Sequence, residues 1–193
     1  MISFVKFSLI IHEFYNNNDG NNNNGDGNNN IFSLVINPIS MNLELNKYNK
    51  NFKLLKFFGT CSIPDSRNFN PFSPKYSVGI RNDDYVVTGL PSDYKLKNYS
   101  SGGKCVKIIK KKYSPVLISE EEIKKEKKRW GERNFNFPKY HNPFSTFSID
   151  SENRIFAKTY EKPEPGDSDI YDVFDSEGIF IAKVLLKKNY FCL

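Results

Sequence analysis

The 193-residue chain has few alanines and few cysteines, and each scarcity excludes a class of structure. Alanine, the strongest helix former, occurs only at positions 157 and 182, so the composition does not favour long helices. The three cysteines, Cys61, Cys105 and Cys192, lie far apart and form no CxxC pair, which excludes a disulfide framework and a zinc site. Because Cys105 lies inside an apolar run, we expect it to be a small core residue.

Residues that carry catalysis or bind metal are also scarce. The two histidines, His12 and His141, have no further ligand residues at metal-binding spacing. The sequence contains no GxSxG, HExxH or phosphate-binding loop. The acidic turns at 83–84, 150–152 and 175–177 lack the ligand pattern of an EF-hand, and turn chemistry explains them. We therefore assign no catalytic residue, no metal site and no cofactor.

Long apolar runs are absent as well. No segment reaches the roughly 18 consecutive apolar residues of a membrane helix, so no membrane span is expected. The opening MISFVKFSLIIHEF has a short apolar run, but His12 and Glu13 end it and no small-residue cleavage site follows. We interpret it as a strand rather than a signal peptide, and assign no compartment.

Aromatic residues, in contrast, are abundant: 17 Phe and 11 Tyr favour strands. The net charge of +6 permits attraction to phosphates. Lys104, Lys107 and the run 110–112 continue towards 124–129 with aromatic residues between them, a pattern that nucleic-acid surfaces share. We favour an ordinary exposed strand face over a nucleic-acid partner, since three of these lysines lie on a strand whose other residues are apolar.

Residues 16–30 contain only Asn, Asp and Gly. Such a tract has no apolar surface to bury and cannot offset the entropy lost on ordering. We expect a disordered loop at the tip of a hairpin.

The remaining chain consists of short β-type runs separated by turn residues. The expected strands are 4–14, 31–36, 41–49 and 52–58; 77–80, 85–90, 94–99 and 104–111; and 145–149, 154–161, 169–174 and 179–186. One helix is expected at 119–130. Ser119 and Glu122 form a capping box, three glutamates follow the cap, basic residues end the helix, and Gly131 closes it. Its narrow apolar stripe predicts a surface helix.

The strand groups repeat. Tyr48, Tyr99 and Phe174 align, and four residues later Phe52, Gly103 and Gly178 coincide. In the next strand Lys53–Phe58 aligns with Lys104–Ile109 and 179–184, and Asn-Pro-Phe-Ser occurs twice, at 70–73 and 142–145. Unequal spacing argues against a solenoid, which needs a fixed pitch, and suits a propeller, in which insertions collect in loops. We expect Phe174, Phe180, Ile181 and Val184 to pack between sheets.

The predicted fold is an all-β, partial β-propeller of about three four-stranded antiparallel blades with one inserted surface helix. Residues 1–193 form a single domain: blade one spans about 2–58 and contains the loop 16–30, blade two about 77–111, and blade three about 145–186. The helix at 119–130 falls between the last two blades.

The blade pattern over roughly 41–186 resembles bacterial six-bladed β-propellers of the NHL-like type. The residues that carry the resemblance are Ile149-Asp150, Ile155-Phe156, Tyr171–Asp175 and Gly178 in the last blade, and Ile80, Val86-Val87, Leu96, Tyr99-Ser100 and Gly103 in the middle one. The order of Pro-rich connection, blade, charged helix and final blade looks like the C-terminal half of uncharacterised exported propellers. The resemblance implies that about three of six blades are present.

The leading functional hypothesis is a non-enzymatic binding or scaffold module, a fragment or half of a larger six-bladed propeller of unknown ligand. The chain is either a truncated remnant or is completed by a protein partner or a second copy, with a small ligand as a further option. The alternative is half of a propeller hydrolase of lactone or sugar-ester type. Candidate binding residues are aromatic or cationic side chains in loops, the types enriched at contact hot spots: Tyr94, Trp130, Arg133, Tyr140 and His141.

Overall fold

The computed structural model describes residues 10–11, 31–37, 39–40, 42–62, 69–82, 85–131, 133–163 and 166–187. The predicted loop at 16–30 and most of the predicted strand at 4–14 lie outside these residues. The chain divides into two compact units: Met1–Ile63 with Tyr99–Lys104, and Pro64–Asn98 with Cys105–Leu193. Each unit is described by itself below.

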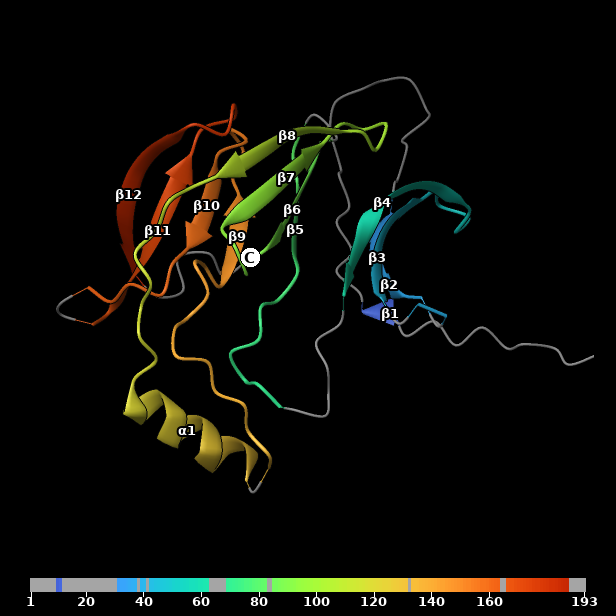
Figure 1. Cartoon of the computed structure of the whole chain (residues 1–193). Helices are drawn as coiled ribbons and strands as arrows, with labels where there is room; N and C mark the ends of the chain where they lie inside the picture. Colours follow the sequence, from blue (N-terminus) through green and yellow to red (C-terminus); the bar gives the residue numbers. More distant parts are fainter. Residues whose placement is uncertain are drawn as a thin grey trace, which may run out of the picture. The chain divides into compact units, whose positions relative to one another are not determined.

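The described elements form three four-stranded antiparallel sheets, each with its strands in chain order (Figure 1). The first sheet contains β1 (Ile10–Ile11), β2 (Ile31–Ile36), β3 (Asn42–Tyr48) and β4 (Leu54–Ser62). The second contains β5 (Ser77–Ile80), β6 (Val86–Leu90), β7 (Lys95–Tyr99) and β8 (Cys105–Lys110). The third contains β9 (Thr146–Ile149), β10 (Ile155–Lys158), β11 (Ser168–Phe174) and β12 (Phe180–Lys187). The expected all-β class is confirmed, although β4 continues four residues beyond the predicted end at 58.

Matching turns join the last two strands of each sheet. Phe52, Gly103 and Gly178, which the sequence repeat aligns, have φ angles of 56°, 76° and 75°. Each of them donates its backbone N–H to the carbonyl three residues earlier, at 2.8–2.9 Å. This is a three-residue hairpin loop that ends in a left-handed residue, a position suited to glycine. The backbone therefore repeats at the positions where the sequence repeats.

In the first unit the core is built around an aromatic group. Phe58 on β4 packs against Phe32 on β2, with ring centroids 5.8 Å apart, and edge-on against Tyr99 at 6.2 Å. Leu45 on β3 is also fully buried. Tyr99 belongs to this unit together with the turn that follows it.

In the second unit, β5 and β9 lie side by side (Figure 1). Their approach is close: a Cβ atom on Gly79 of β5 would lie 2.7 Å from Cδ1 of Ile149 on β9. The core between the second and third sheets contains Val87, Tyr94, Leu96, Ile109, Phe144, Phe147, Ile155, Ala157 and Phe174. Aromatic and branched side chains dominate this core, as the composition predicts.

The helix α1 (Glu120–Trp130) lies away from the sheets, at the end of long loops (Figure 1). Both halves of the predicted capping box are present: Oγ of Ser119 accepts from the Glu122 N–H, and the Glu122 carboxylate accepts from the Ser119 N–H. Gly131 closes the helix by donating its N–H to the Lys127 carbonyl. None of the helix residues is buried, which confirms a surface helix.

Two predictions about packing are wrong. Cys105 is exposed, because β8 is an outer strand on which Ile109 is the one buried residue. Phe180 and Ile181 on β12 are 43% and 52% exposed, whereas Phe174 is buried as expected. A register shift between Val173 and Phe174 pairs Phe174 with Phe180 but Val173 with Ala182, so the simple alternation of faces fails there.

Candidate functional site

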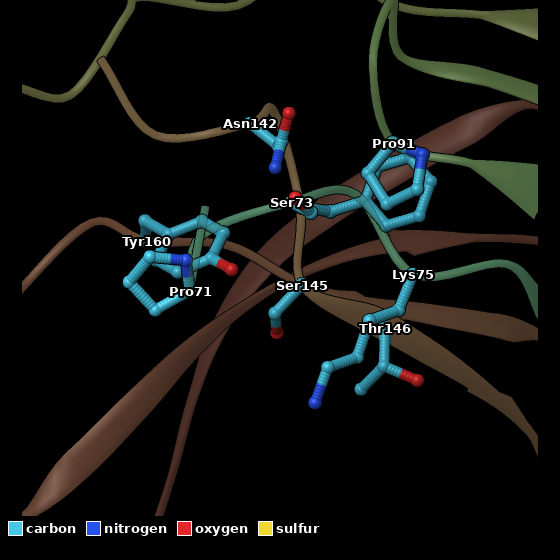
Figure 2. Close-up of a pocket in the computed structure, with 9 residues that line it drawn as sticks. Pro71, Ser73, Lys75, Pro91, Asn142, Ser145, Thr146 and Tyr160 are labelled. Atoms are coloured by element: carbon cyan, nitrogen blue, oxygen red, sulfur yellow. The ribbon is translucent and has the colours of Figure 1, made fainter. Parts of the chain in front are cut away.

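Nine residues of the second unit line a cavity of about 230 Å³ (Figure 2). They come from the segments that precede β5 and β9, from the first residue of β9, and from the segments that follow β6 and β10. The lining residues are Pro71, Ser73, Lys75, Pro91, Asn142, Phe144, Ser145, Thr146 and Tyr160. Five of them belong to the two Asn-Pro-Phe-Ser segments. The sequence shows that this motif occurs twice, but not that the two copies lie next to each other.

Side-chain hydrogen bonds shape these two segments. In the first, Oδ1 of Asn70 accepts from the Phe72 N–H at 2.9 Å, and Oγ of Ser73 donates to the Asn70 carbonyl at 2.8 Å. Short polar side chains that bond their own backbone in this way stabilise turns. The second segment is tied to the first, because Nδ2 of Asn142 donates to the Phe72 carbonyl at 2.9 Å. The cavity therefore has fixed walls on two sides.

The lining combines apolar rings with hydroxyl and amide groups. Pro71, Pro91 and Phe144 supply the apolar part, and the polar part consists of the side chains of Ser73, Asn142, Ser145, Thr146 and Tyr160. Lys75 contributes a cation, and among the described residues no carboxylate belongs to the lining. Burial and then the nearby Glu122 carboxylate raise the pKa of Tyr160, so its hydroxyl remains a hydrogen-bond donor at neutral pH. The hydroxyl and amide groups suit a polar ligand, and the volume of about 230 Å³ suits a small one, because pockets for drug-sized ligands begin at roughly 300 Å³.

His141 lies behind Tyr160, and the two rings stack with centroids 4.1 Å apart. Phe72 meets the imidazole edge-on at 5.4 Å, and Nε2 lies 3.3 Å from Oε1 of Glu122 on α1. Burial lowers the pKa of His141 and outweighs the opposing effect of Glu122, so the imidazole is neutral at pH 7. The contact is therefore one between a neutral ring and a carboxylate, not a full ion pair.

The Glu122 carboxylate is a junction between the helix and the loops. It accepts hydrogen bonds from the N–H and hydroxyl of Ser119, at 2.9 and 2.8 Å, and lies 3.0 Å from Nζ of Lys162. Partial burial acts to raise the pKa of Glu122, but the hydrogen bonds from Ser119 and Lys162 prevail and lower it to about 2. This carboxylate joins α1 to the segment that carries Tyr160 and Lys162.

Another buried polar group, Tyr94, packs against Phe144 of the cavity lining. Tyr94 is fully buried, packs on Phe144 at 5.1 Å and donates its hydroxyl to Oδ2 of Asp172 at 2.6 Å. Nζ of Lys111 lies 3.1 Å from the same oxygen. Burial and the neighbouring Asp172 carboxylate raise the pKa of Tyr94, so the hydroxyl stays protonated. Tyr94 is thus a core residue that backs Phe144.

The remaining sequence-predicted residues lie outside the cavity. Trp130 is half-exposed, meets Phe69 edge-on at 5.1 Å and donates its Nε1–H to Glu126. The guanidinium of Arg133 lies over the Phe69 and Trp130 rings, at 5.1 and 5.4 Å, so these three residues form one cluster. Tyr140 is exposed beside Lys139. Of the five predicted binding residues, Tyr94 and His141 are buried and cannot take part in a surface contact, and none lines the cavity.

Within the residues that the structure describes, no group of three or more His, Cys, Asp and Glu side chains could hold a metal ion. No helix in this part of the chain has the length and apolar character to cross a membrane.

No family model matches the chain, and no curated protein matches it. Among solved structures, a protein of unknown function from Bacteroides caccae is 11% identical, with a TM-score of 0.30. The alignment covers 84% of this chain and 64% of that protein, so the chain spans less than two thirds of its length. A match at this TM-score carries no conclusion about fold or function.

Proposed function

We propose that the chain is a non-enzymatic binding or scaffold module in which the three sheets are three blades of a six-bladed, NHL-like β-propeller. The cavity between the two Asn-Pro-Phe-Ser segments is its binding site for a small polar ligand. The architecture and the ligand rest on different observations and are tested separately.

The observation that carries the architecture is a contact that occurs twice. In the first unit, a Cβ atom on Gly103 would lie 2.6 Å from Cε of Lys56 on β4. In the second unit, a Cβ atom on Gly178 would lie 2.6 Å from Cδ1 of Ile109 and 3.6 Å from Cδ of Lys107, both on β8. Lys56 and Lys107 occupy the same position of the repeat. The final turn of one repeat thus approaches the outer strand of the repeat before it, as stacked blades require.

A second pair of positions repeats in the same way. Tyr99 packs on Phe58 in the first unit, and Phe174 shares a buried cluster with Ile109 in the second. Tyr99 aligns with Phe174, and Phe58 with Ile109. One ring contact and one shared buried cluster at equivalent positions support the proposal that successive blades pack in the same way.

The ligand proposal rests on the lining of the cavity. The hydroxyls of Ser73 and Ser145 donate to the backbone carbonyls of Asn70 and Lys158, so their oxygens offer acceptor capacity to a ligand. The Tyr160 phenol and the Thr146 hydroxyl can donate, and the Asn142 amide keeps its oxygen and a second N–H beside its bond to Phe72. A small polyol or sugar fragment matches this lining, and Lys75 adds affinity for a small anion such as a carboxylate.

The hydrolase alternative requires a base or nucleophile at the cavity. In the described part of the chain, the His141–Glu122 pair lies behind Tyr160, and neither residue lines the cavity. Glu122 is committed to the helix cap and to Lys162. These positions favour binding over hydrolysis.

The ligand proposal can be tested by recording amide NMR spectra of the full chain with a panel of small polyols, sugars and carboxylates. We expect saturable shifts at Ser73, Ser145 and Thr146 that disappear in Thr146→Phe, which fills the cavity. Thr60→Phe, at an exposed strand threonine of the first unit, is the matched control and should keep the shifts. Lys75→Ala should weaken the binding of carboxylates more than the binding of polyols. A panel without any shift at these amides would contradict the ligand proposal.

An experimental structure of the full chain tests the architecture. We expect successive sheets to be related by rotations of about 60° around one axis, as six blades demand. Two sheets that do not follow this rotation would overturn the propeller proposal and leave the ligand result unaffected.

A further inference from the structure

Phe52 is unusual among the three equivalent turn residues. Gly103 and Gly178 tolerate positive φ angles, whereas Phe52 has φ 56° with a large side chain, and it is 66% exposed. A bulky apolar residue in a left-handed conformation is strained and exposes its ring to water. The first repeat therefore carries a protruding phenyl ring where the other two repeats carry no side chain.

At the other end of the repeat series, β12 has the opposite substitution. Ala182 occupies the position of Lys56 on β4 and Lys107 on β8, the lysines approached by Gly103 and Gly178. In two places, a turn glycine without a side chain thus lies next to a lysine on the outer strand of the preceding repeat: Gly103 next to Lys56, and Gly178 next to Lys107. The two unmatched members of the repeat are a large turn residue, Phe52, and a small strand residue, Ala182.

A second set of equivalent positions differs in burial between the internal repeats and the two outer ones. The internal pairs Tyr99 with Phe58 and Phe174 with Ile109 are buried on both sides. The unmatched members of this pair are Tyr48 in the first repeat and Val184 on β12, and both are half-buried. Both end positions thus keep accessible surface that their internal counterparts lose.

We propose that a second copy of this chain docks head to tail, with the turn 49–52 of one copy against β12 of the other. Phe52 then lies over Ala182, and Tyr48 over Val184, as the internal repeats pack on one another. This interface deepens the proposed propeller function and rests on it. The partner is a second copy because this chain carries both sides of the contact.

Under the proposed six-bladed architecture, two copies that each supply three blades make two such contacts, and the assembly is a closed dimer. The residues on and beside β12 are consistent with an outer strand that a second copy covers. Ile179 aligns with Lys53 and Lys104, and Leu185 aligns with Lys110. Lysines are a common means of protecting a sheet edge, and exposed apolar residues stand at these positions instead: Ile179 just before β12 and Leu185 on it.

The test is the molar mass of the full chain, measured by size-exclusion chromatography with light scattering over a range of concentrations. We expect the wild type to have twice the chain mass. Ala182→Lys should be monomeric, because the lysine collides with Phe52. The double variant Phe52→Gly with Ala182→Lys recreates the internal glycine–lysine pair and should restore the dimer.

Val106→Lys on β8 is the matched control, since it also places a lysine at a half-exposed apolar position of an outer strand. It should remain dimeric. Trp130 fluorescence and circular dichroism confirm that each variant is folded.

A monomeric wild type, an open series of larger assemblies, or a double variant that stays monomeric would each overturn the docking proposal. A monomer whose experimental structure still shows successive sheets rotated about one axis would overturn the dimer alone. Sheets without that rotation would overturn the proposed function as well.

Discussion

The hydroxyl of Tyr94 donates a 2.6 Å hydrogen bond to Oδ2 of Asp172, and both side chains are buried in the core of the second unit. Lys111 approaches the same oxygen at 3.1 Å and lies over the Tyr94 ring. The Asp172 carboxylate thus has one neutral donor and one cation. Buried charges persist in proteins when such partners compensate them.

Tyr94→Phe should destabilise the second unit. It removes a hydrogen bond to a charged group, and such bonds contribute roughly 1.5–3 kcal/mol. Trp130 is the only tryptophan and belongs to this unit, so urea unfolding followed by its fluorescence measures the loss. Tyr113→Phe is the control, because Tyr113 is a more exposed neighbour of Tyr94. Equal losses in both variants would contradict the assigned role of the hydrogen bond.

Gly178→Ala should cost about 2–4 kcal/mol of unfolding free energy, since strain at positive φ adds to overpacking. The φ angle of Gly178 is 75°, and a Cβ atom would lie 2.6 Å from Cδ1 of Ile109. Urea unfolding monitored at Trp130 measures this cost.

A double-variant comparison separates the two causes. Ile109→Ala removes both Cδ1 and Cγ1, the two atoms within 2.7 Å of the added Cβ, so Gly178→Ala with Ile109→Ala should cost less than the sum of the two single variants. Strict additivity would mean that the turn and β8 are not in the close contact that the repeat indicates.

The sequence predicts strands and turns well where local chemistry dominates. The turn at Asp175–Gly178 combines an Asp that caps its own loop with a glycine at the left-handed position, and both roles are present in the structure. The capping box of Ser119 and Glu122 likewise depends on residues three apart. Such signals need no knowledge of distant segments.

Burial on the outer strands was not predictable in the same way. Whether Cys105 or Ile109 is covered depends on which other segment lies over β8, and the turn at Gly178 covers Ile109. The cavity was missed for a related reason. The two Asn-Pro-Phe-Ser segments lie far apart in the sequence and meet through the bond from Asn142 to Phe72. The sequence shows that the motif occurs twice, but it does not show that the two copies lie side by side in the fold.

Cys105 should react with a thiol reagent in the native protein, because it is exposed on β8. In a variant with Cys61→Ser and Cys192→Ser, we expect one thiol per chain to react with dithionitrobenzoic acid without denaturant. The native rate should approach the rate measured in urea. A thiol that reacts only after unfolding would restore the original expectation of a core cysteine.

Acid should weaken the second unit in two separate pH windows around α1. The folded-state pKa of His141 is below its ordinary value of 6.5, so the unfolded chain binds more protons as the pH falls below that value. The pKa of Glu122 falls from 4.5 to about 2, so its stabilising effect is complete above about pH 4.5 and is lost towards pH 2. As the pH falls, the free energy of unfolding should therefore decrease first because His141 resists protonation in the folded state, and then because Glu122 becomes protonated.

Two variants distinguish these windows when the urea midpoint is measured by Trp130 fluorescence across the acid range. His141→Phe keeps an aromatic ring stacked on Tyr160 and should remove the dependence of the urea midpoint on pH in the first window. Glu122→Gln keeps a capping-box residue, removes the carboxylate next to Lys162 and should flatten the second. Lys162→Met, which retains Glu122 and its bonds to Ser119, should reduce the second window without abolishing it. If Glu122→Gln loses stability below pH 4.5 as steeply as the wild type, other carboxylates govern acid unfolding, and the Glu122 junction does not hold α1 in place.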